Sequence, residues 1–306
     1  MLKIYHKKVK DKELKELDQL AAGSWVNVES PTEEEAVFLR DKLFLEEDLI
    51  KDATDPYEVP RLERQKDIIY FFTRVAIRED DGRVATTPIL VAVTPGFVVT
   101  VSSRELKFLD NLKKAADFST TQRTNLVLQI FESINAEYSK FFTEVTRKVR
   151  SSVANVERVR NEDIAQFVAF EEVLANFINS LVPTNASLRN ILSGKFIGLH
   201  KEDEELIEDL LLHNTQLISN CEINLKSITN IREAYSSIMT NNLNQSIKIL
   251  TVLTVIIAIP TLVTSFYGMN VSLPLSGSPF SYLMAIGISV VISALVLMIF
   301  IRNRWL

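Results

Sequence analysis

The sequence has little cysteine and no excess of positive charge. Its single cysteine, Cys221, excludes a disulfide framework and a cluster of cysteine thiolates around a metal. The 34 Lys and Arg against 39 Asp and Glu give a net charge of −5. This balance excludes a nucleic-acid-binding protein that relies on bulk positive charge. The N-terminal residues contain no apolar run of signal-peptide length, so we expect the N-terminus not to be exported.

Charge is also absent from most of the C-terminal region. No Asp, Glu, Lys or Arg occurs between Ile249 and Ile301, a stretch of about 53 residues. This length suits two membrane spans of about 20 residues each, and the middle of the stretch is rich in the turn formers Gly, Pro, Asn and Ser. We therefore predict transmembrane helices at about 248–267 and about 281–301.

The charges that flank these spans predict their orientation. Lys248 precedes the first span, Arg302 and Arg304 follow the second, and the turn between the spans carries no charge. The positive-inside rule therefore predicts a multi-pass protein of the cell membrane with both termini in the cytoplasm.

The first 115 residues predict an α/β domain. They contain five runs of β-branched and aromatic residues that end at Gly, Pro or charged residues, which is typical of strands. Between two of these runs, Thr32 and Glu35 have the spacing of a capping box, which predicts a helix through about Leu45.

Residues 116–247 have apolar residues at steps of three and four, which predicts a helical stalk. We expect an interruption at Pro183 and a last helix that starts near Lys201. That helix has no further Pro or Gly before Pro260, so it should continue unbroken into the first span for about 60 residues, roughly 90 Å. A helix of this length cannot bury its apolar surface alone, so a bundle of helices or subunits is expected.

These segments together predict an α+β membrane protein in three parts. The parts are a cytoplasmic α/β domain (1–115), a helical stalk with a long helix that leads into a pore (116–247), and a transmembrane hairpin (248–306).

One face of the first span is polar, and the second span has no such face. Read at steps of three or four residues, the first span carries mostly small or hydroxyl side chains on this face. Small residues also serve helix packing in membranes, but the difference between the spans favours a first span that faces water and a second that faces lipid. The face consists of Asn244, Ile247, Thr251, Thr254, Ala258, Thr261, Ser265 and Gly268.

The polar face ends at Tyr267-Gly268-Met269-Asn270. This arrangement resembles the CorA family of divalent-cation channels, whose signature is GMN at the outer end of the first of two C-terminal spans. The resemblance implies a funnel-shaped homopentamer in contact with membrane lipid. It also implies passive Mg²⁺ uptake, with Co²⁺ or Ni²⁺ as further permeant ions, and closure of the channel by cytosolic Mg²⁺. No motif for an enzyme or for nucleic-acid binding is present.

The resemblance assigns roles to the outer mouth and to the pore. Five Asn270 amides would ring the entrance and accept hydrogen bonds from the water shell of Mg²⁺, which dehydrates reluctantly. Gly268 would let the backbone approach the axis, and Met269 would pack against the turn. The pore lining implied by the family consists of Asn244, Ile247, Leu250, Ala258, Thr261 and Gly268, with Leu250 assigned by the resemblance alone.

The resemblance also implies a regulatory Mg²⁺ site between neighbouring subunits. Its carboxylates would come from Asp48 and Glu47 in the N-terminal domain and from Asp209 on the long helix. Two carboxylates at 4 Å repel by about 4 kcal/mol at an effective dielectric constant of 20, and a bridging Mg²⁺ removes this repulsion. Mg²⁺ is therefore expected both as transported ion and as regulator.

Two alternatives stay open at this stage. A proton-coupled zinc importer of the ZntB type shares the two-span plan, although such relatives often carry GVN, and Met269 favours the magnesium branch. A cytoplasmic scaffold with a membrane anchor would gain nothing from the hydroxyl residues on one face of the first span.

Overall fold

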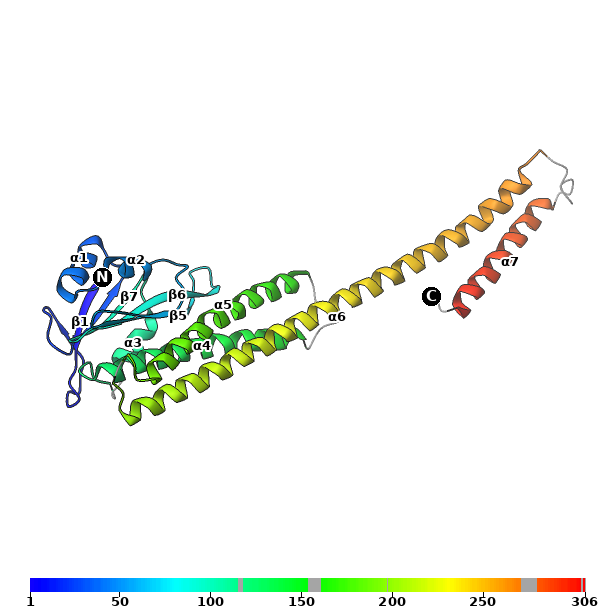
Figure 1. The fold of residues 1–306 in the computed structure, drawn as a ribbon. Coiled ribbons are helices and arrows are strands. Elements are labelled where there is room, and N and C mark those ends of the chain that lie inside the picture. The colour runs from blue at the N-terminus through cyan, green and yellow to red at the C-terminus, as the bar shows by residue number, and fades with distance from the viewer. Residues whose placement is uncertain (115–117, 154–160, 197, 271–279, 304, 306) are drawn as a thin grey trace. The chain divides into compact units, whose positions relative to one another are not determined.

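The computed structural model describes residues 1–114, 118–153, 161–196, 198–270, 280–303 and 305. The chain forms two compact units, Met1–Asn230 and Ile231–Leu306. Figure 1 shows a sheet with helices in the first unit, and the second unit is formed by the last part of one long helix and a second apolar helix. The division into three parts at residues 115 and 247 stays a prediction.

The first unit contains a seven-stranded sheet with the order β2-β1-β3-β7-β6-β5-β4. Neighbouring strands are antiparallel except for the parallel pair β3–β7. All five predicted runs form strands, so the α/β domain is confirmed; the sequence reading missed β2 and β4, the two edge strands. The strands are β1 (Leu2–His6), β2 (Lys15–Leu17), β3 (Trp25–Glu29), β4 (Arg61–Gln65), β5 (Ile68–Arg78), β6 (Val84–Val93) and β7 (Val98–Ser102).

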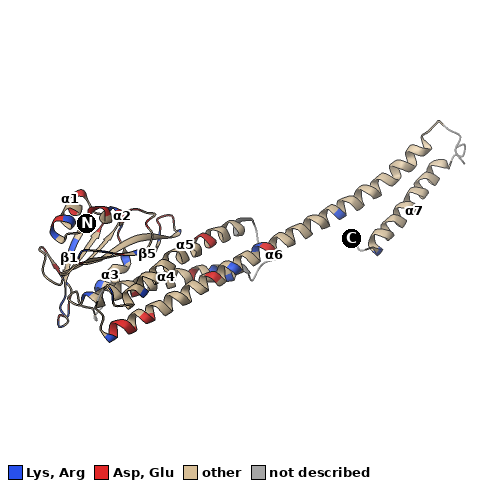
Figure 2. Ribbon diagram, viewed as in Figure 1, with Lys and Arg blue, Asp and Glu red and all other residues tan. Residues whose placement is uncertain are grey.

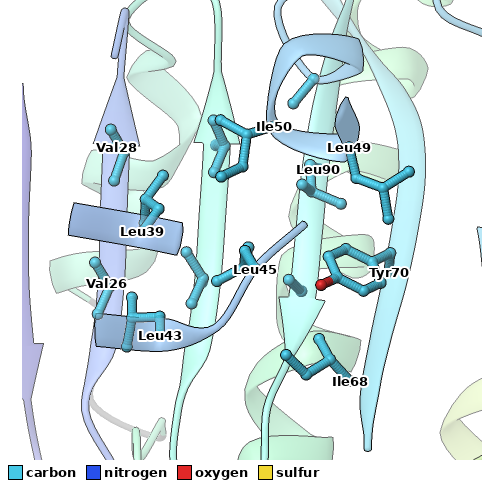
Figure 3. Close-up of a cluster of buried hydrophobic side chains, with 14 of the residues drawn as sticks. Val26, Val28, Leu39, Leu43, Leu45, Leu49, Ile50, Ile68, Tyr70 and Leu90 are labelled. Atoms are coloured by element: carbon cyan, nitrogen blue, oxygen red, sulfur yellow. The ribbon is translucent and has the colours of Figure 1, made fainter. Parts of the chain in front are cut away.

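Two short helices, α1 (Glu33–Leu43) and α2 (Glu47–Asp52), cover one face of the sheet. Figure 3 shows their leucine and isoleucine side chains packed on Val26, Tyr70 and other strand residues. The predicted capping box begins α1: Thr32 Oγ1 accepts from the Glu35 N–H at 3.2 Å, and Glu35 Oε2 accepts from the Thr32 N–H at 3.0 Å. The Glu46 N–H donates to Tyr70 Oη at 3.1 Å, which ties the start of α2 to the sheet.

The other face of the sheet packs against α4 (Arg123–Val153) and α5 (Asn161–Leu192), with the shorter α3 (Lys107–Lys114) beside α4. Phe71 of β5 meets Phe131 of α4 edge to face at a centroid distance of 5.5 Å. Because side chains alternate along a strand, Phe71 and Tyr70 point to opposite faces of the sheet. Helices α2 and α4 therefore lie on opposite sides of it.

The predicted interruption at Pro183 is wrong, because Pro183 lies inside α5. Proline removes one hydrogen bond of the helix and normally breaks it. Here Leu181 and Thr184 are buried on either side, and Thr184 Oγ1 lies 3.0 Å from Thr73 Oγ1 of the sheet. Packing of α5 against the sheet offsets the lost hydrogen bond.

The long helix α6 (Lys201–Tyr267) starts at the predicted residue and continues without interruption for 67 residues, roughly 100 Å. Within the first unit its buried positions recur at steps of three and four, as in a helix that packs along one seam. They include Ile207, Leu210, Asn214, Leu217 and Cys221. Helix α7 (Ser281–Arg302) follows, and α6 and α7 are both long and apolar enough to cross a membrane.

Candidate functional site

In the second unit, the pattern of buried residues indicates that α7 covers one face of α6. On α6, Val252 and Val263 are buried, and on α7 the small residues Ala285 and Ser289 are buried. Ser289 donates its hydroxyl proton to the Ala285 carbonyl at 2.8 Å, so its polar group is satisfied inside its own helix. The i, i+4 spacing of these two small residues is typical of close helix packing in membranes.

The polar face of the first span lies on the opposite side of α6. At 100° per residue, Thr254 and Thr261 are about half a turn around the axis from Val252 and Val263. No residue of the described second unit covers this face, and all of its members from residue 244 to 265 are exposed. These exposed residues are Asn244, Ile247, Thr251, Thr254, Ala258, Thr261 and Ser265, and Leu250, assigned to the pore by the resemblance, is exposed as well.

The hydroxyl groups on this face direct their protons toward the helix backbone. Thr251, Thr254 and Thr261 donate to the backbone carbonyl four residues earlier, at 2.8, 2.8 and 3.2 Å. A hydroxyl has one proton and two lone pairs, so a hydroxyl that donates to the backbone presents only an acceptor outward. The polar face is therefore a hydrogen-bond acceptor face, and its oxygens suit the protons of a hydrated cation.

Charge is distributed unevenly along α6. Figure 2 shows acidic residues at the start of α6, and beyond Lys248 neither the rest of this helix nor α7 carries a charge before Arg302. The flanking Arg304 lies outside the described residues, as do residues 271–279 of the turn predicted between the spans.

The GMN segment follows the end of α6. Helix α6 ends at Tyr267, which is half-buried, and the Gly268 N–H still donates to the Thr264 carbonyl at 3.0 Å. A Cβ at Gly268 would lie 3.3 Å from that carbonyl oxygen, which is tight for any larger residue. Met269 and Asn270 are exposed in the single chain.

The three predicted regulatory carboxylates are all exposed, but one of them is already paired. Glu47 forms ion pairs with Lys51 at 2.8 Å and Arg40 at 3.2 Å, and hydrogen bonds from Lys51 and Arg40 lower the pKa of its carboxyl. Asp48 and Asp209 form no ion pair or hydrogen bond with a described residue. Asp48 and Asp209 are therefore the better candidates for binding a cation.

One chain does not bring these carboxylates together. Asp48 lies on α2 and Asp209 on α6, and α2 lies on the face of the sheet opposite the α4–α5 layer. Among the described residues no group of three His, Cys, Asp or Glu side chains is arranged to hold a metal ion. A site that uses both aspartates needs a second chain.

Sequence reasoning missed the contribution of α7 to this arrangement. The burial of Ala285 and Ser289 indicates that this side of α7 faces α6, whereas the sequence indicated only that the second span has no polar face. Their spacing of four residues was the available signal.

Comparison with known sequences relates this chain to a family of transport proteins. The sequence model of the CorA-like Mg²⁺ transporter proteins matches residues 21–302. The chain is 26% identical over 297 residues to the cobalt/magnesium transport protein CorA of Methanocaldococcus jannaschii. The alignment covers 92% of this chain and 91% of that protein.

Solved structures show the same fold. The complete structure of the CorA magnesium transporter from Methanocaldococcus jannaschii matches with a TM-score of 0.87 at 23% identity, covering 100% of this chain and 99% of that one. The ZntB cytoplasmic domain from Vibrio parahaemolyticus matches with a TM-score of 0.65 at 10% identity, covering 78% of this chain and 98% of that one. The chain therefore shares its fold with these structures. The resemblance inferred from the GMN segment is confirmed: the chain belongs to the family of CorA-like Mg²⁺ transporter proteins.

Proposed function

We propose that this chain is the subunit of a homopentameric channel for passive Mg²⁺ uptake, with α6 around the central axis and α7 toward lipid. The observation that carries the proposal is the position of the acceptor face of α6 on the side opposite α7. Within the hairpin, α7 leaves this hydroxyl-bearing face of α6 uncovered. In a membrane, such a face is better placed toward water than toward lipid, which favours a water-filled pore formed by several copies of the chain. Both termini would lie in the cytoplasm.

The chemistry of the face fits a hydrated divalent ion. Mg²⁺ holds its waters tightly, and those waters donate hydrogen bonds, so neutral oxygen acceptors bind the hydrated ion without stripping it. Thr251, Thr254 and Thr261 supply such oxygens along the helix, and Asn270 supplies an amide oxygen at its end. The same acceptors accommodate hydrated Co²⁺ or Ni²⁺.

The membrane potential supplies enough driving force for uptake without ATP. A divalent ion that crosses 100 mV, negative inside, gains about 4.6 kcal/mol, which corresponds to more than three decades of concentration. The gate would lie where Ile247, Leu250 and Ala258 project apolar side chains into the pore, because apolar rings close a pore by excluding water.

Metal uptake into proteoliposomes tests this function and its zinc alternative. The full-length protein should admit Mg²⁺ along its electrochemical gradient whether or not a pH gradient is present. Uptake of Zn²⁺ that requires an inward proton gradient, with no uptake of Mg²⁺, would instead identify a ZntB-type importer. Absence of all metal uptake from a folded protein would favour the membrane-anchored scaffold.

A pair of cysteine substitutions tests which face of α6 lines the axis. Thr261→Cys should react with a charged, membrane-impermeant thiol reagent added from outside, and the reaction should block Mg²⁺ uptake. Val263→Cys, two residues away at the same depth, faces α7 and should stay unmodified. Equal modification of the two thiols would contradict the proposed orientation.

The native thiol does not interfere with this experiment. Cys221 is buried in the first unit, and burial together with the nearby Glu222 raises the pKa of its thiol to about 12. The thiolate is the reactive form, so Cys221 should stay unmodified at neutral pH.

A further inference from the structure

A cavity of about 540 Å³ lies between α4 and α6 in the first unit. This volume falls within the range of small-molecule sites, about 300–1,000 Å³. Its apolar walls come from both helices, with Leu128 and Ala136 on α4 and Leu206 and Leu210 on α6.

The charged groups of the cavity are all acidic. Glu132 projects from α4 and Asp209 from α6, and neither forms an ion pair or hydrogen bond with a residue in the described part of the chain. No Lys or Arg is among the lining residues. The cavity therefore attracts cations, and both carboxylates are available to accept hydrogen bonds.

The register of the two helices separates the carboxylates. Ser139 Oγ and His213 Nε2 are 3.1 Å apart, and α4 and α6 run in the same direction (Figure 1). Asn135 precedes Ser139 by four residues and Asp209 precedes His213 by four, so these two lie at the same level along the helices. Glu132 precedes Asn135 by three residues, so it lies about 4.5 Å further toward the N-terminal end of α4. Across the described residues no trio of metal-ligating side chains converges on one point. Two separated carboxylates suit two separated positive charges.

A buried amide beside the cavity lacks a partner. Asn135 lines the cavity, its side chain is only 2% exposed, and its Nδ2 has no hydrogen-bond partner among the described residues. Buried polar atoms are normally bonded, so an unsatisfied one at a cavity wall indicates that a ligand or water completes the site. A half-turn of the amide exchanges Nδ2 and Oδ1, so this group serves as either donor or acceptor.

We propose that this cavity binds linear polyamines, organic cations whose amino groups are joined by methylene chains. Two ammonium groups would donate to Glu132 and Asp209, the methylene chain would lie against the leucines, and a further N–H would reach the Asn135 amide. A compact hydrated Mg²⁺ fits less well, because it needs polar partners all round and meets apolar walls here.

This binding does not rest on the proposed transport function. It has a consequence for it, because Asp209 is also the carboxylate proposed to bind regulatory Mg²⁺. A bound polyamine would occupy that carboxylate and compete with the metal.

Titration calorimetry with spermidine, on the full-length protein in detergent without divalent metal, tests the proposal. Glu132→Gln and Asp209→Asn should each weaken binding by about tenfold or more, because each removes one charge-assisted hydrogen bond. Glu208→Gln, the same change at an exposed neighbour that does not line the cavity, should leave the affinity unaltered. n-Butylamine, with one positive charge, should bind more weakly than spermidine by about tenfold or more.

A variant that fills the cavity provides a second test. Ala136 is exposed at the cavity wall, so Ala136→Phe should block the site without changing charge or disturbing the core. Unaltered spermidine affinity in this variant overturns the proposal, as does an equal loss in Glu208→Gln and Asp209→Asn, which would indicate diffuse attraction to an acidic helix. Glu132→Gln should leave the effect of Mg²⁺ on the cytoplasmic unit unchanged, which separates polyamine binding from metal sensing.

Discussion

Replacing Asn270 with alanine should lower Mg²⁺ uptake by at least about 100-fold while the oligomer still assembles. The amide is expected to accept hydrogen bonds from the waters of the entering ion, and a hydrogen bond to a charged partner contributes about 1.5–3 kcal/mol. A pentamer loses five amides at once, and about 3 kcal/mol already corresponds to two decades in rate. Initial uptake rates in proteoliposomes measure the effect.

The proposed assembly should survive this change because Asn270 is exposed beyond the end of α6 and packs in neither unit of the chain. Asn242→Ala is the matched control: Asn242 is an exposed residue of α6 about half a turn from Asn244, so it lies off the acceptor face. An Asn270→Ala oligomer of normal size that transports at the original rate would remove this residue from the ion pathway.

The elements that could be predicted from the sequence are those with a strong local pattern. The five core strands have dense β-branched and aromatic runs, and α6 has no Pro or Gly before Pro260, so both follow from composition alone. The polar face of the first span follows from the period of the helix, since spacing fixes which side chains share a face.

The elements that could not be predicted are held by partners far away in the sequence. Strand β4 reads as a polar, charged segment, but Arg61 stacks over the Phe72 ring at 4.0 Å and forms an ion pair with Asp52 at 2.7 Å. Pro183 continues a helix because the sheet packs against it. The cavity between α4 and α6 depends on the register of two helices, which the Ser139–His213 contact defines and which no local pattern encodes.

The position of the candidate site was predictable in part. The acceptor face was derived from spacing, but that α7 covers the opposite face required the burial of Val252 and Val263. The aspartates were assigned by the resemblance to CorA, and neither shows a distinguishing local pattern. Only the fold reveals that the sheet separates Asp48 from Asp209 within one chain.

If Mg²⁺ regulates the channel as the resemblance to CorA implies, Asp209→Asn should weaken the protection of the first unit against protease by Mg²⁺. It should also make channel closure less sensitive to cytosolic Mg²⁺. The proposed reason is that Asp48 of one chain approaches Asp209 of its neighbour, and neither is paired with a described residue of its own chain. Brought to about 4 Å, two carboxylates repel by about 4 kcal/mol at an effective dielectric constant of 20, and a bridging ion removes that repulsion. Limited proteolysis at millimolar Mg²⁺ measures the effect.

The double variant with Asp48→Asn tests whether the two residues hold the same ion. If they do, the second change should add little to the first, because removing one ligand already releases the ion and coupled sites are not additive. Glu208→Gln controls for the loss of one charge on α6, and Glu47→Gln should have the smaller effect because Lys51 and Arg40 already engage that carboxylate. Full protection of the double variant would remove both aspartates from metal sensing. The proposed ion pathway would still stand, because it depends on the acceptor face of α6 and not on the cytoplasmic carboxylates.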